Sequence, residues 1–169
     1  MAIDNETLAL RKIQYLHEKF AEIEVKTKVL EKNQLLDMST LLVSAEKDYK
    51  GREQLVNLAY LLELSEEETN IMLLQFFTEL PIELNATQIP LVETLISFIN
   101  TRMPIGHFGV QNSKVHFRYV MVDTKDSVDH AMQTIETFFM YVDILDIFQE
   151  SIESVILGTM TLDTLKTKF

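Results

Sequence analysis

The N-terminal segment has apolar and small side chains spaced as on one face of a helix. They recur at intervals of three and four, at Ile13, Leu16, Phe20, Ile23, Thr27 and Leu30. This period predicts a helix over about residues 5–32, with Asn5 as its N-cap. The residues from Ile23 to Val29 also alternate in the manner of a strand, so a strand is the alternative for the second half of the segment.

Three runs rich in β-branched, aromatic and leucine residues follow, at residues 39–47, 53–64 and 70–80. Gly51, in the sequence DYKGR, predicts a turn between the first two runs. Alternate positions of the second and third runs make one strongly apolar face. Its members are Val56, Leu58, Tyr60, Leu62, Leu64, Met72, Leu74, Phe76 and Leu80. We expect an antiparallel meander with this face toward the core.

The opposite face of the second and third runs is mixed rather than polar. Its apolar members include Leu55, Ala59, Leu61, Leu73 and Phe77. A sheet face open to water is normally more polar. We therefore expect part of it to be covered, either by the chain's own helix or by another protein, and these five residues are the candidate surface for self-association or for a polypeptide client.

The second half of the chain predicts a helix, a hairpin and a long helix. Residues 87–104 have a helical apolar face with Pro90 in the first turn, and residues 104–123 alternate as a hairpin. Residues 126–158 predict a long helix that ends at Gly158.

The predicted fold is α+β, an antiparallel sheet packed with helices in the order α-βββ-α-ββ-α. We assign it to a single domain over residues 1–169, because the chain has no linker-like or low-complexity stretch. The core of this domain covers about residues 38–158. The short C-terminal tail, residues 159–169, adds one helical turn.

Two histidines of the predicted hairpin, His107 and His116, could take part in chemistry. With a tight turn at residues 112–113 they lie diagonally on one sheet face, where two imidazoles could share a metal ion. A metal-assisted hydrolase is therefore the alternative hypothesis. A metal site needs further ligands, and the neighbours Lys114 and Arg118 are cationic, so we expect a polar outer face and no metal site.

The charge of the chain excludes some partners. Lys and Arg number 15 and Asp and Glu 26, a net charge of −11, with 47% hydrophobic residues. An acidic surface repels phosphate, so we expect neither a nucleic-acid nor a membrane partner. One helical stripe consists of Asp143, Asp146, Glu150 and Glu153. Solvation is the favoured interpretation of this stripe, and docking of a basic partner segment is the alternative.

The absence of cysteine excludes disulfides, thiolate zinc sites and cysteine nucleophiles. The start of the chain also lacks the pattern of a signal peptide, so we expect a cytoplasmic protein. No phosphate-binding loop and no convincing nucleophile and base are present. We therefore assign no catalytic, metal-binding or cofactor-binding residue.

The hairpin INTRMPIGHFGVQNSKVHFRYVMV and the segment ESIESVILGTMTLDTL together resemble the YbjN-like family, whose fold is that of the type III secretion chaperones. The matching residues are Pro104, Gly106, Phe108, Gly109, Phe117, Arg118 and Tyr119, followed by Gly158, Thr161 and Leu162. The resemblance implies a small acidic protein, often dimeric, that binds other polypeptides or regulates without catalysis. Our leading hypothesis is a non-enzymatic, chaperone-like or regulatory binding module that forms a homodimer. A purely structural subunit is a further alternative.

Overall fold

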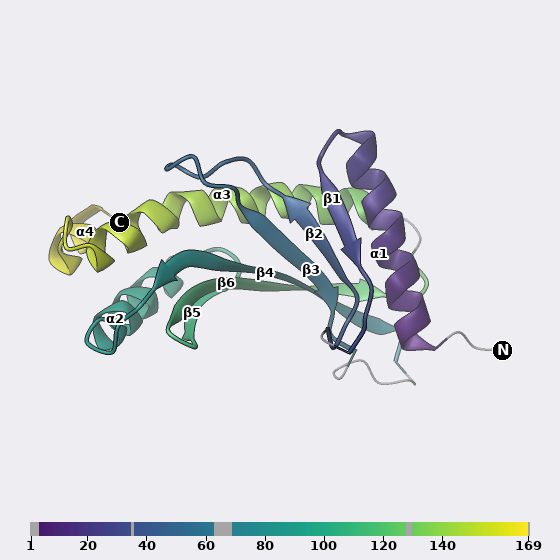
Figure 1. Ribbon diagram of the computed structural model, residues 1–169, viewed down its shortest axis with the longest axis horizontal. Helices are drawn as coiled ribbons and strands as arrows, with labels where there is room; N and C mark the ends of the chain where they lie inside the picture. Colours follow the sequence, from purple (N-terminus) through teal and green to yellow (C-terminus); the bar gives the residue numbers. More distant parts are fainter. Residues whose placement is uncertain (1–3, 35, 63–68, 128–129, 169) are drawn as a thin grey trace. The chain divides into compact units, whose positions relative to one another are not determined.

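The computed structural model describes residues 4–34, 36–62, 69–127 and 130–168. It has an α+β fold with a six-stranded antiparallel sheet, whose hydrogen-bonding order is β1-β2-β3-β4-β6-β5 (Figure 1). The strands are β1 Thr27–Leu30, β2 Thr40–Ser44, β3 Leu55–Tyr60, β4 Ile71–Glu83, β5 His107–Gln111 and β6 Lys114–Thr124. The helices in the described ranges are α1 Asn5–Glu22, α2 Ile89–Asn100, α3 Ala131–Ile156 and α4 Leu162–Lys168.

The chain divides into two compact units, which are described separately. Unit 1 comprises Met1–Phe77 and Val120–Phe139, and unit 2 comprises Thr78–Tyr119 and Met140–Phe169. The division passes through β4, β6 and α3, so each unit contains part of these three elements. The single domain over residues 1–169 stays a prediction.

The first helix of unit 1 is shorter than predicted. Its N-cap is Asp4 rather than Asn5, because the Asp4 carboxylate accepts hydrogen bonds from the Thr7 backbone (2.9 Å) and hydroxyl (2.8 Å). The helix ends at Glu22, and Glu24 has a positive φ of 62°. The predicted span of 5–32 is therefore wrong in its second half.

The residues after this turn form a strand, β1, that the predicted order lacks. Thr27–Leu30 pairs antiparallel with β2, with Lys28 opposite Leu42. A helix through this segment would gain the i,i+4 charge pairs Glu22 with Lys26 and Glu24 with Lys28, but each such pair stabilises a helix by only a few tenths of a kcal/mol. The β-branched alternation of Val25, Thr27 and Val29 decides the conformation instead, since these side chains fit a half-buried pleated surface.

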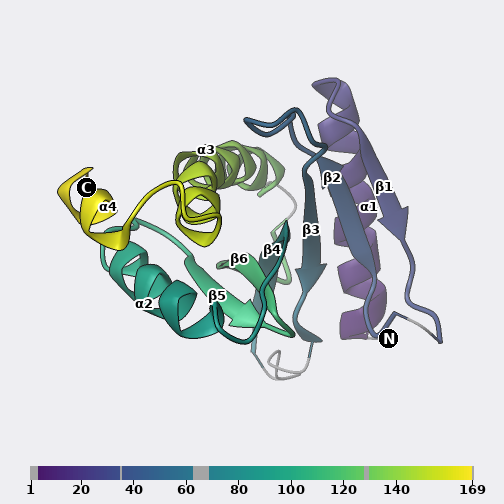
Figure 2. The same cartoon turned by 60° about the vertical axis from the view of Figure 1, so that its left-hand side comes forward.

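The core of unit 1 lies between the sheet and two helices on the same face. Ile13, Leu16 and Phe20 of α1 are buried, and α1 lies against β1 and β2 (Figure 2). The Phe20 ring meets Phe138 of α3 edge to face, with centroids 5.3 Å apart. The sheet contributes Leu41, Val43, Val56, Leu58, Tyr60, Met72, Leu74 and Phe76, all buried. The predicted apolar face is confirmed for these residues and for Leu80 in unit 2, but Leu62 is only half-buried and lies beyond the end of β3; Leu64 lies outside the described residues.

The hairpin of unit 2 has the predicted register. His107 lies opposite Arg118 and Gly109 opposite His116. The turn residues Asn112 and Ser113 both have positive φ, 51° and 61°. This two-residue turn matches the right-handed twist of the flanking strands.

Aromatic rings fill the core of unit 2. Phe117 of β6 stacks on Phe108 of β5, with centroids 4.7 Å apart, and on Tyr141 of α3, with centroids 4.5 Å apart. The Tyr141 hydroxyl donates a hydrogen bond to the Phe117 carbonyl at 2.7 Å. The long helix ends before Gly158, whose φ of 72° confirms the predicted end. The tail contains α4, a seven-residue helix and hence more than the single turn predicted.

The backbone of one residue in the edge strand β5 is hydrogen-bonded by a side chain of α2. The Asn100 amide nitrogen donates to the Phe108 carbonyl at 3.0 Å, and its amide oxygen accepts from the Phe108 backbone nitrogen at 2.9 Å. Asn100 therefore occupies the backbone groups that a further strand would use at this position.

Candidate protein-binding surface

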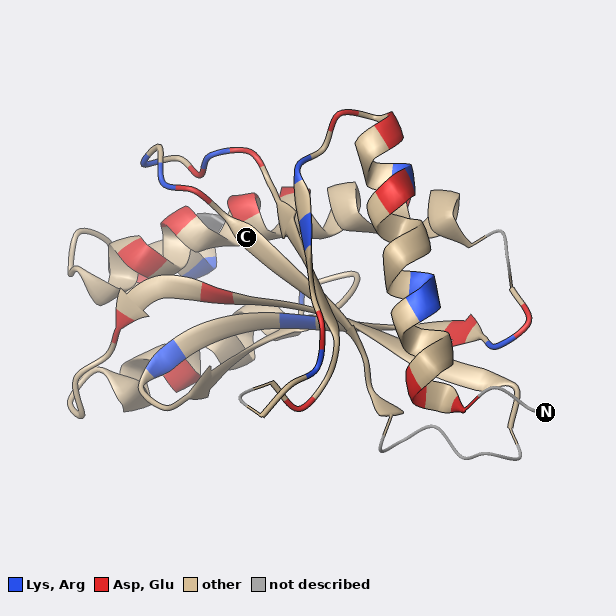
Figure 3. Ribbon diagram, turned by 45° about the vertical axis from the view of Figure 1, so that its right-hand side comes forward, with Lys and Arg blue, Asp and Glu red and all other residues tan. Residues whose placement is uncertain are grey.

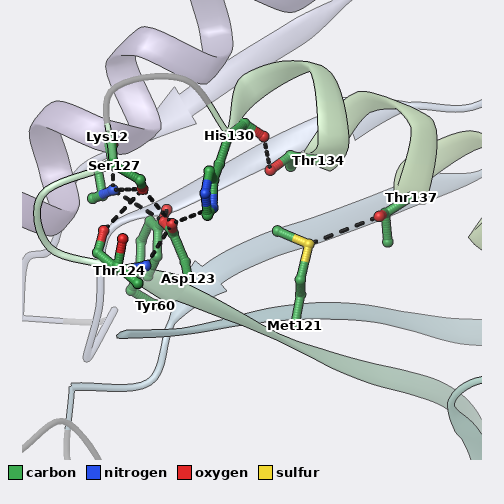
Figure 4. A network of polar contacts seen from close by, with 9 residues as sticks. All are labelled: Lys12, Tyr60, Met121, Asp123, Thr124, Ser127, His130, Thr134 and Thr137. Atoms are coloured by element: carbon green, nitrogen blue, oxygen red, sulfur yellow. Dashed lines mark hydrogen bonds and ion pairs between the residues drawn. The ribbon is translucent and has the colours of Figure 1, made fainter. Parts of the chain in front are cut away.

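The most polar buried cluster of unit 1 surrounds Asp123 of β6 (Figure 4). The Tyr60 hydroxyl donates to its carboxylate at 2.6 Å, and the Ser127 hydroxyl at 2.6 Å. Lys12 of α1 completes an ion pair at 3.1 Å, with the Asp123 side chain only 3% exposed. The Lys12 ammonium also donates to the Ser127 hydroxyl and carbonyl, both at 3.0 Å.

The hydrogen bonds of this cluster outweigh the cost of burying its charge. Burial alone would raise the pKa of Asp123, but bonds from Ser127, Tyr60, the Thr124 backbone and Lys12 bring it below its ordinary value. Burial and the nearby Asp123 carboxylate raise the pKa of Tyr60, which stays a neutral donor. The cluster is thus an anion held by neutral and cationic donors.

The geometry does not fit a hydrolase. The Ser127 hydroxyl donates to Asp123 Oδ1 at 2.6 Å, and His130 Nδ1 lies 3.0 Å from the same oxygen. The carboxylate therefore lies between serine and histidine, whereas nucleophile activation needs the imidazole in that place. The adjoining cavity measures about 20 Å³, room for about one water molecule. We conclude that the cluster links α1, β3 and β6.

Sequence reasoning missed this cluster because Lys12 and Asp123 are far apart in the chain. A usable signal was nonetheless present. Asp123 stands two residues after Met121, at an inward position of an alternating strand, and Lys12 stands beside Ile13 in the apolar stripe of the first helix. Charged residues at core positions are almost always paired.

The hairpin histidines lie on one face, as predicted. His107 is exposed and His116 is half-buried, with its ring against Gly109. A Cβ at Gly109 would lie 2.7 Å from the His116 ring, so this close approach requires glycine. Burial, and then the charges of His107 and Arg118, lower the pKa of His116.

These two imidazoles are too few for a metal centre. Within the ranges that the structure describes, no group of three or more His, Cys, Asp or Glu side chains is placed to hold a metal ion. Zinc sites use at least three protein ligands. The arrangement therefore gives the hydrolase hypothesis no structural support.

The five residues of the predicted partner surface lie on one face of the sheet in unit 1. The Leu61 backbone nitrogen donates to the Leu73 carbonyl at 2.9 Å, which places these two leucines side by side. Phe77 lies opposite Asn57, and Ala59 lies opposite Gln75. Directly opposed residues of antiparallel strands point to the same face.

The five residues differ in how accessible they are. Leu55 is 47% exposed, and Leu61, Leu73 and Phe77 are half-buried. Ala59 is only 5% exposed, since it lies between the larger side chains of Thr40 and Gln75. A partner could therefore contact the leucines and Phe77, but hardly Ala59.

Further apolar residues extend this surface. Ile71 of β4 is 48% exposed and Val122 of β6 is 60% exposed. Val122 points away from the helices because its neighbour Asp123 points toward Lys12 of α1. We call the accessible set the β-face; it comprises Leu42, Leu55, Leu61, Ile71, Leu73, Phe77 and Val122.

The β-face carries no charge, and the polar side chains that lie between its members, Asn57 and Gln75, are uncharged. The strands β2 and β3 and the unit 1 part of β4 contain no Asp, Glu, Lys or Arg, and they are tan in Figure 3. On the same face, Lys28 of β1 lies opposite Leu42 at one margin, and Glu79 of β4 follows Phe77 by two residues at another. The helices α1 and α3 of unit 1 both pack on the other face, through Lys12 and the contact of Phe20 with Phe138. In a chain with a net charge of −11, this surface stands out.

Comparisons with known proteins do not assign the chain to a family. No protein-family model matches the chain, and no curated protein matches it in sequence. Across the described ranges, none of the helices is both long enough and apolar enough to cross a bilayer.

Proposed function

We propose that the chain is a non-enzymatic protein-binding module, chaperone-like or regulatory, that forms a homodimer through the β-face of unit 1. The observation that carries the proposal is a set of accessible apolar side chains on one sheet face, with no charged residue among them, in an otherwise acidic chain. Exposed apolar patches of this kind mark interaction sites. The resemblance of the hairpin and the closing segment to the YbjN-like family, with the fold of type III secretion chaperones, supports the same class, and a cytoplasmic location is part of the proposal.

A second copy is the partner that suits this surface best. A two-fold symmetric interface brings the same patch of both subunits together. Most of the surface of this chain would repel its copy, because like charges would meet. The β-face reduces that repulsion, since none of its side chains is charged and the charges at its margins, Lys28 and Glu79, have opposite signs. A polypeptide client then binds elsewhere on the dimer.

Sedimentation velocity tests the proposal with Leu55→Asp and Ile71→Asp. Both side chains are about half exposed (47% and 48%), so the isolated subunit should tolerate the change. A carboxylate in the apolar interface should weaken the dimer by about a hundred-fold or more, since burying an unpaired charge is costly. We expect a dimer for the unaltered chain and a monomer for both variants.

Leu91→Asp is the matched control, because Leu91 is 41% exposed and lies on α2 of unit 2. This variant should remain dimeric. A monomeric unaltered chain at all concentrations would overturn the proposal, as would a control that dissociates to the same extent as the β-face variants.

A further inference from the structure

The unit 2 part of α3, together with Leu157 directly after it, presents a second apolar stripe on its outer side. Met140 is 41% exposed, Ile147 56% and Leu157 63%. They alternate with polar residues that share their side of the helix, at successive spacings of three and four. We call this set the α3 stripe; it comprises Met140, Asp143, Ile147, Glu150, Ser154 and Leu157.

The α3 stripe faces away from the core of unit 2. The opposite side of the same helix buries Tyr141 against Phe117 and Phe148 against Phe108, with centroids 4.5 Å and 6.3 Å apart. A surface helix normally has one apolar side, which faces the core, and a polar outer side. The outer side of α3 thus carries large apolar side chains that the core does not need.

The charge of α3 has one sign only. Its 26 residues contain Glu136, Asp143, Asp146, Glu150 and Glu153, and no Lys, Arg or His. Red bands mark these carboxylates along the helix in Figure 3. The predicted acidic stripe needs one correction, because Glu153 is fully buried (0% exposed) and only Asp143, Asp146 and Glu150 reach the surface. Glu153 accepts a hydrogen bond from the buried Gln149 at 3.0 Å.

This combination determines the chemistry of a partner. Carboxylates disfavour a second copy of the same stripe, an anionic membrane and nucleic acid, because all of these repel them. The apolar residues between the carboxylates favour burial against another apolar surface. A cationic amphipathic polypeptide satisfies both requirements.

We propose that the α3 stripe binds a cationic amphipathic helix of a partner polypeptide. This inference rests on the proposed protein-binding function and names the class of client. Asp143 and Glu150 are seven residues apart, and so are Met140 and Ile147. A partner helix with basic residues seven apart and apolar residues seven apart on one side matches both rows, which is the helix-on-helix mode of recognition.

A synthetic probe tests the inference by fluorescence anisotropy. The probe is a labelled 18-residue peptide of leucine and lysine with both residue types at seven-residue intervals on one side. A second peptide of the same pattern carries glutamate in place of lysine. We expect saturable binding of the lysine peptide at one site per chain and no binding of the glutamate peptide.

Two variants locate the binding site. The double substitution Asp143→Lys with Glu150→Lys should weaken binding of the lysine peptide by at least about ten-fold, because two attractive charge contacts become repulsive. Ile147→Ser should weaken it by about ten-fold through lost apolar contact. Both sites are exposed, so thermal unfolding should show that the folded state is retained.

Matched controls exclude a general effect of charge or hydrophobicity. Glu93→Lys with Asp163→Lys makes the same change in net charge on α2 and α4, and Leu91→Ser removes an apolar side chain of similar exposure. Both controls should bind the peptide as the unaltered chain does. No binding to the unaltered chain, or equal loss in the control and stripe variants, would overturn the inference.

The inference and the proposed dimer can fail independently. The α3 variants should stay dimeric in sedimentation, and the monomeric Ile71→Asp variant should still bind the peptide. A dimer without peptide binding would refute only the α3 stripe, whereas peptide binding by a chain that is always monomeric would refute only the dimer.

Discussion

Asp123 is a carboxylate at a strand position where the alternation calls for an apolar side chain. Its charge stays in the core because Lys12, Tyr60 and Ser127 all donate to it. A buried ion pair contributes little compared with a well-packed apolar pair, but removing one partner leaves an uncompensated charge. The cluster therefore ties α1 to β3 and β6 within unit 1, and single changes within it should be destabilising.

Replacing Asp123 by Asn should destabilise the chain by about 3 kcal/mol at neutral pH, because the Lys12 ammonium would stay buried without its counter-charge. Denaturant unfolding measures this change. The matched control is Asp163→Asn, whose side chain is 96% exposed and lies 3.9 Å from Lys166. An exposed pair of this kind contributes less than about 1 kcal/mol. Equal effects in the two variants would contradict the role given to the cluster.

The pH dependence of unfolding should identify the same group. The pKa of Asp123 is lowered in the folded state from an ordinary value of 3.8. The stabilisation is therefore complete above pH 3.8 and is lost as the pH falls through the lower folded-state pKa. The difference in stability between the unaltered chain and Asp123→Asn should narrow below pH 3.8, and a difference that stays constant there would assign the stabilisation to another group.

In the β5–β6 hairpin, the conformation of the turn residues accounts for the register of the two strands. Its register follows from a two-residue turn with both residues in the left-handed region. Asn tolerates that region well, but Ser does so at some cost, because its Cβ approaches the following carbonyl oxygen. Ser113 nevertheless adopts this conformation. Its carbonyl accepts a hydrogen bond from the Leu84 backbone nitrogen at 2.7 Å.

Ser113→Gly should therefore stabilise unit 2 by about 0.5–1 kcal/mol, since glycine adopts a positive φ without steric cost. Thermal unfolding measures the change as a rise in Tm. Ser97→Gly, at an exposed position within α2, should instead lower the stability by about 0.5 kcal/mol. A decrease in Tm for both variants would show that the Ser113 side chain stabilises the folded state by more than the positive φ of Ser113 destabilises it.

Sequence patterns predicted the turns and the helix end that depend on a few neighbouring residues. The prediction failed where one segment carried both a helical and a strand period. The turn at Gly51, the hairpin register and the helix end at Gly158 follow from backbone chemistry within a few residues. The segment after Glu22 carries both helical and strand periods, and its pairing with β2 selects the strand. That pairing depends on residues ten or more positions away, which a local period does not include.

At the scale of the whole molecule, charge is unevenly distributed between surfaces. The strands β2 and β3 and the unit 1 part of β4 contain no carboxylate, whereas α3 contains five carboxylates and no base. The five residues of the predicted partner surface could be identified from alternation alone. Val122 and the burial of Ala59 could not, because they depend on which strands become neighbours and on the size of the flanking side chains.

Salt should therefore act in opposite directions on the two proposed interactions. Raising the salt concentration from about 10 mM to about 150 mM shortens the screening length from about 30 Å to about 8 Å. The homodimer should become tighter, since two copies with a net charge of −11 repel each other less. Binding of the lysine peptide to the α3 stripe should become weaker, because its attraction is screened.

Sedimentation and anisotropy at the two salt concentrations provide the comparison. A dimer that weakens with salt would show that ion pairs dominate its interface, contrary to the uncharged β-face. Peptide binding that does not respond to salt would show that the carboxylates of the α3 stripe contribute nothing to it.

The hydrogen bonding of Asn100 to the edge strand β5 affects how copies of the chain could assemble. A sheet with two open edges can recruit copies at both ends and grow into a fibre. Here the sheet ends in β1 at one edge and in β5 at the other, and Asn100 already occupies both backbone groups of Phe108 in β5. Edge-to-edge pairing at β5 is therefore obstructed at Phe108, which leaves β1 as the more open edge. The side-chain amide of Asn100, which completes the hydrogen bonding of Phe108, thus also opposes polymerisation at this edge.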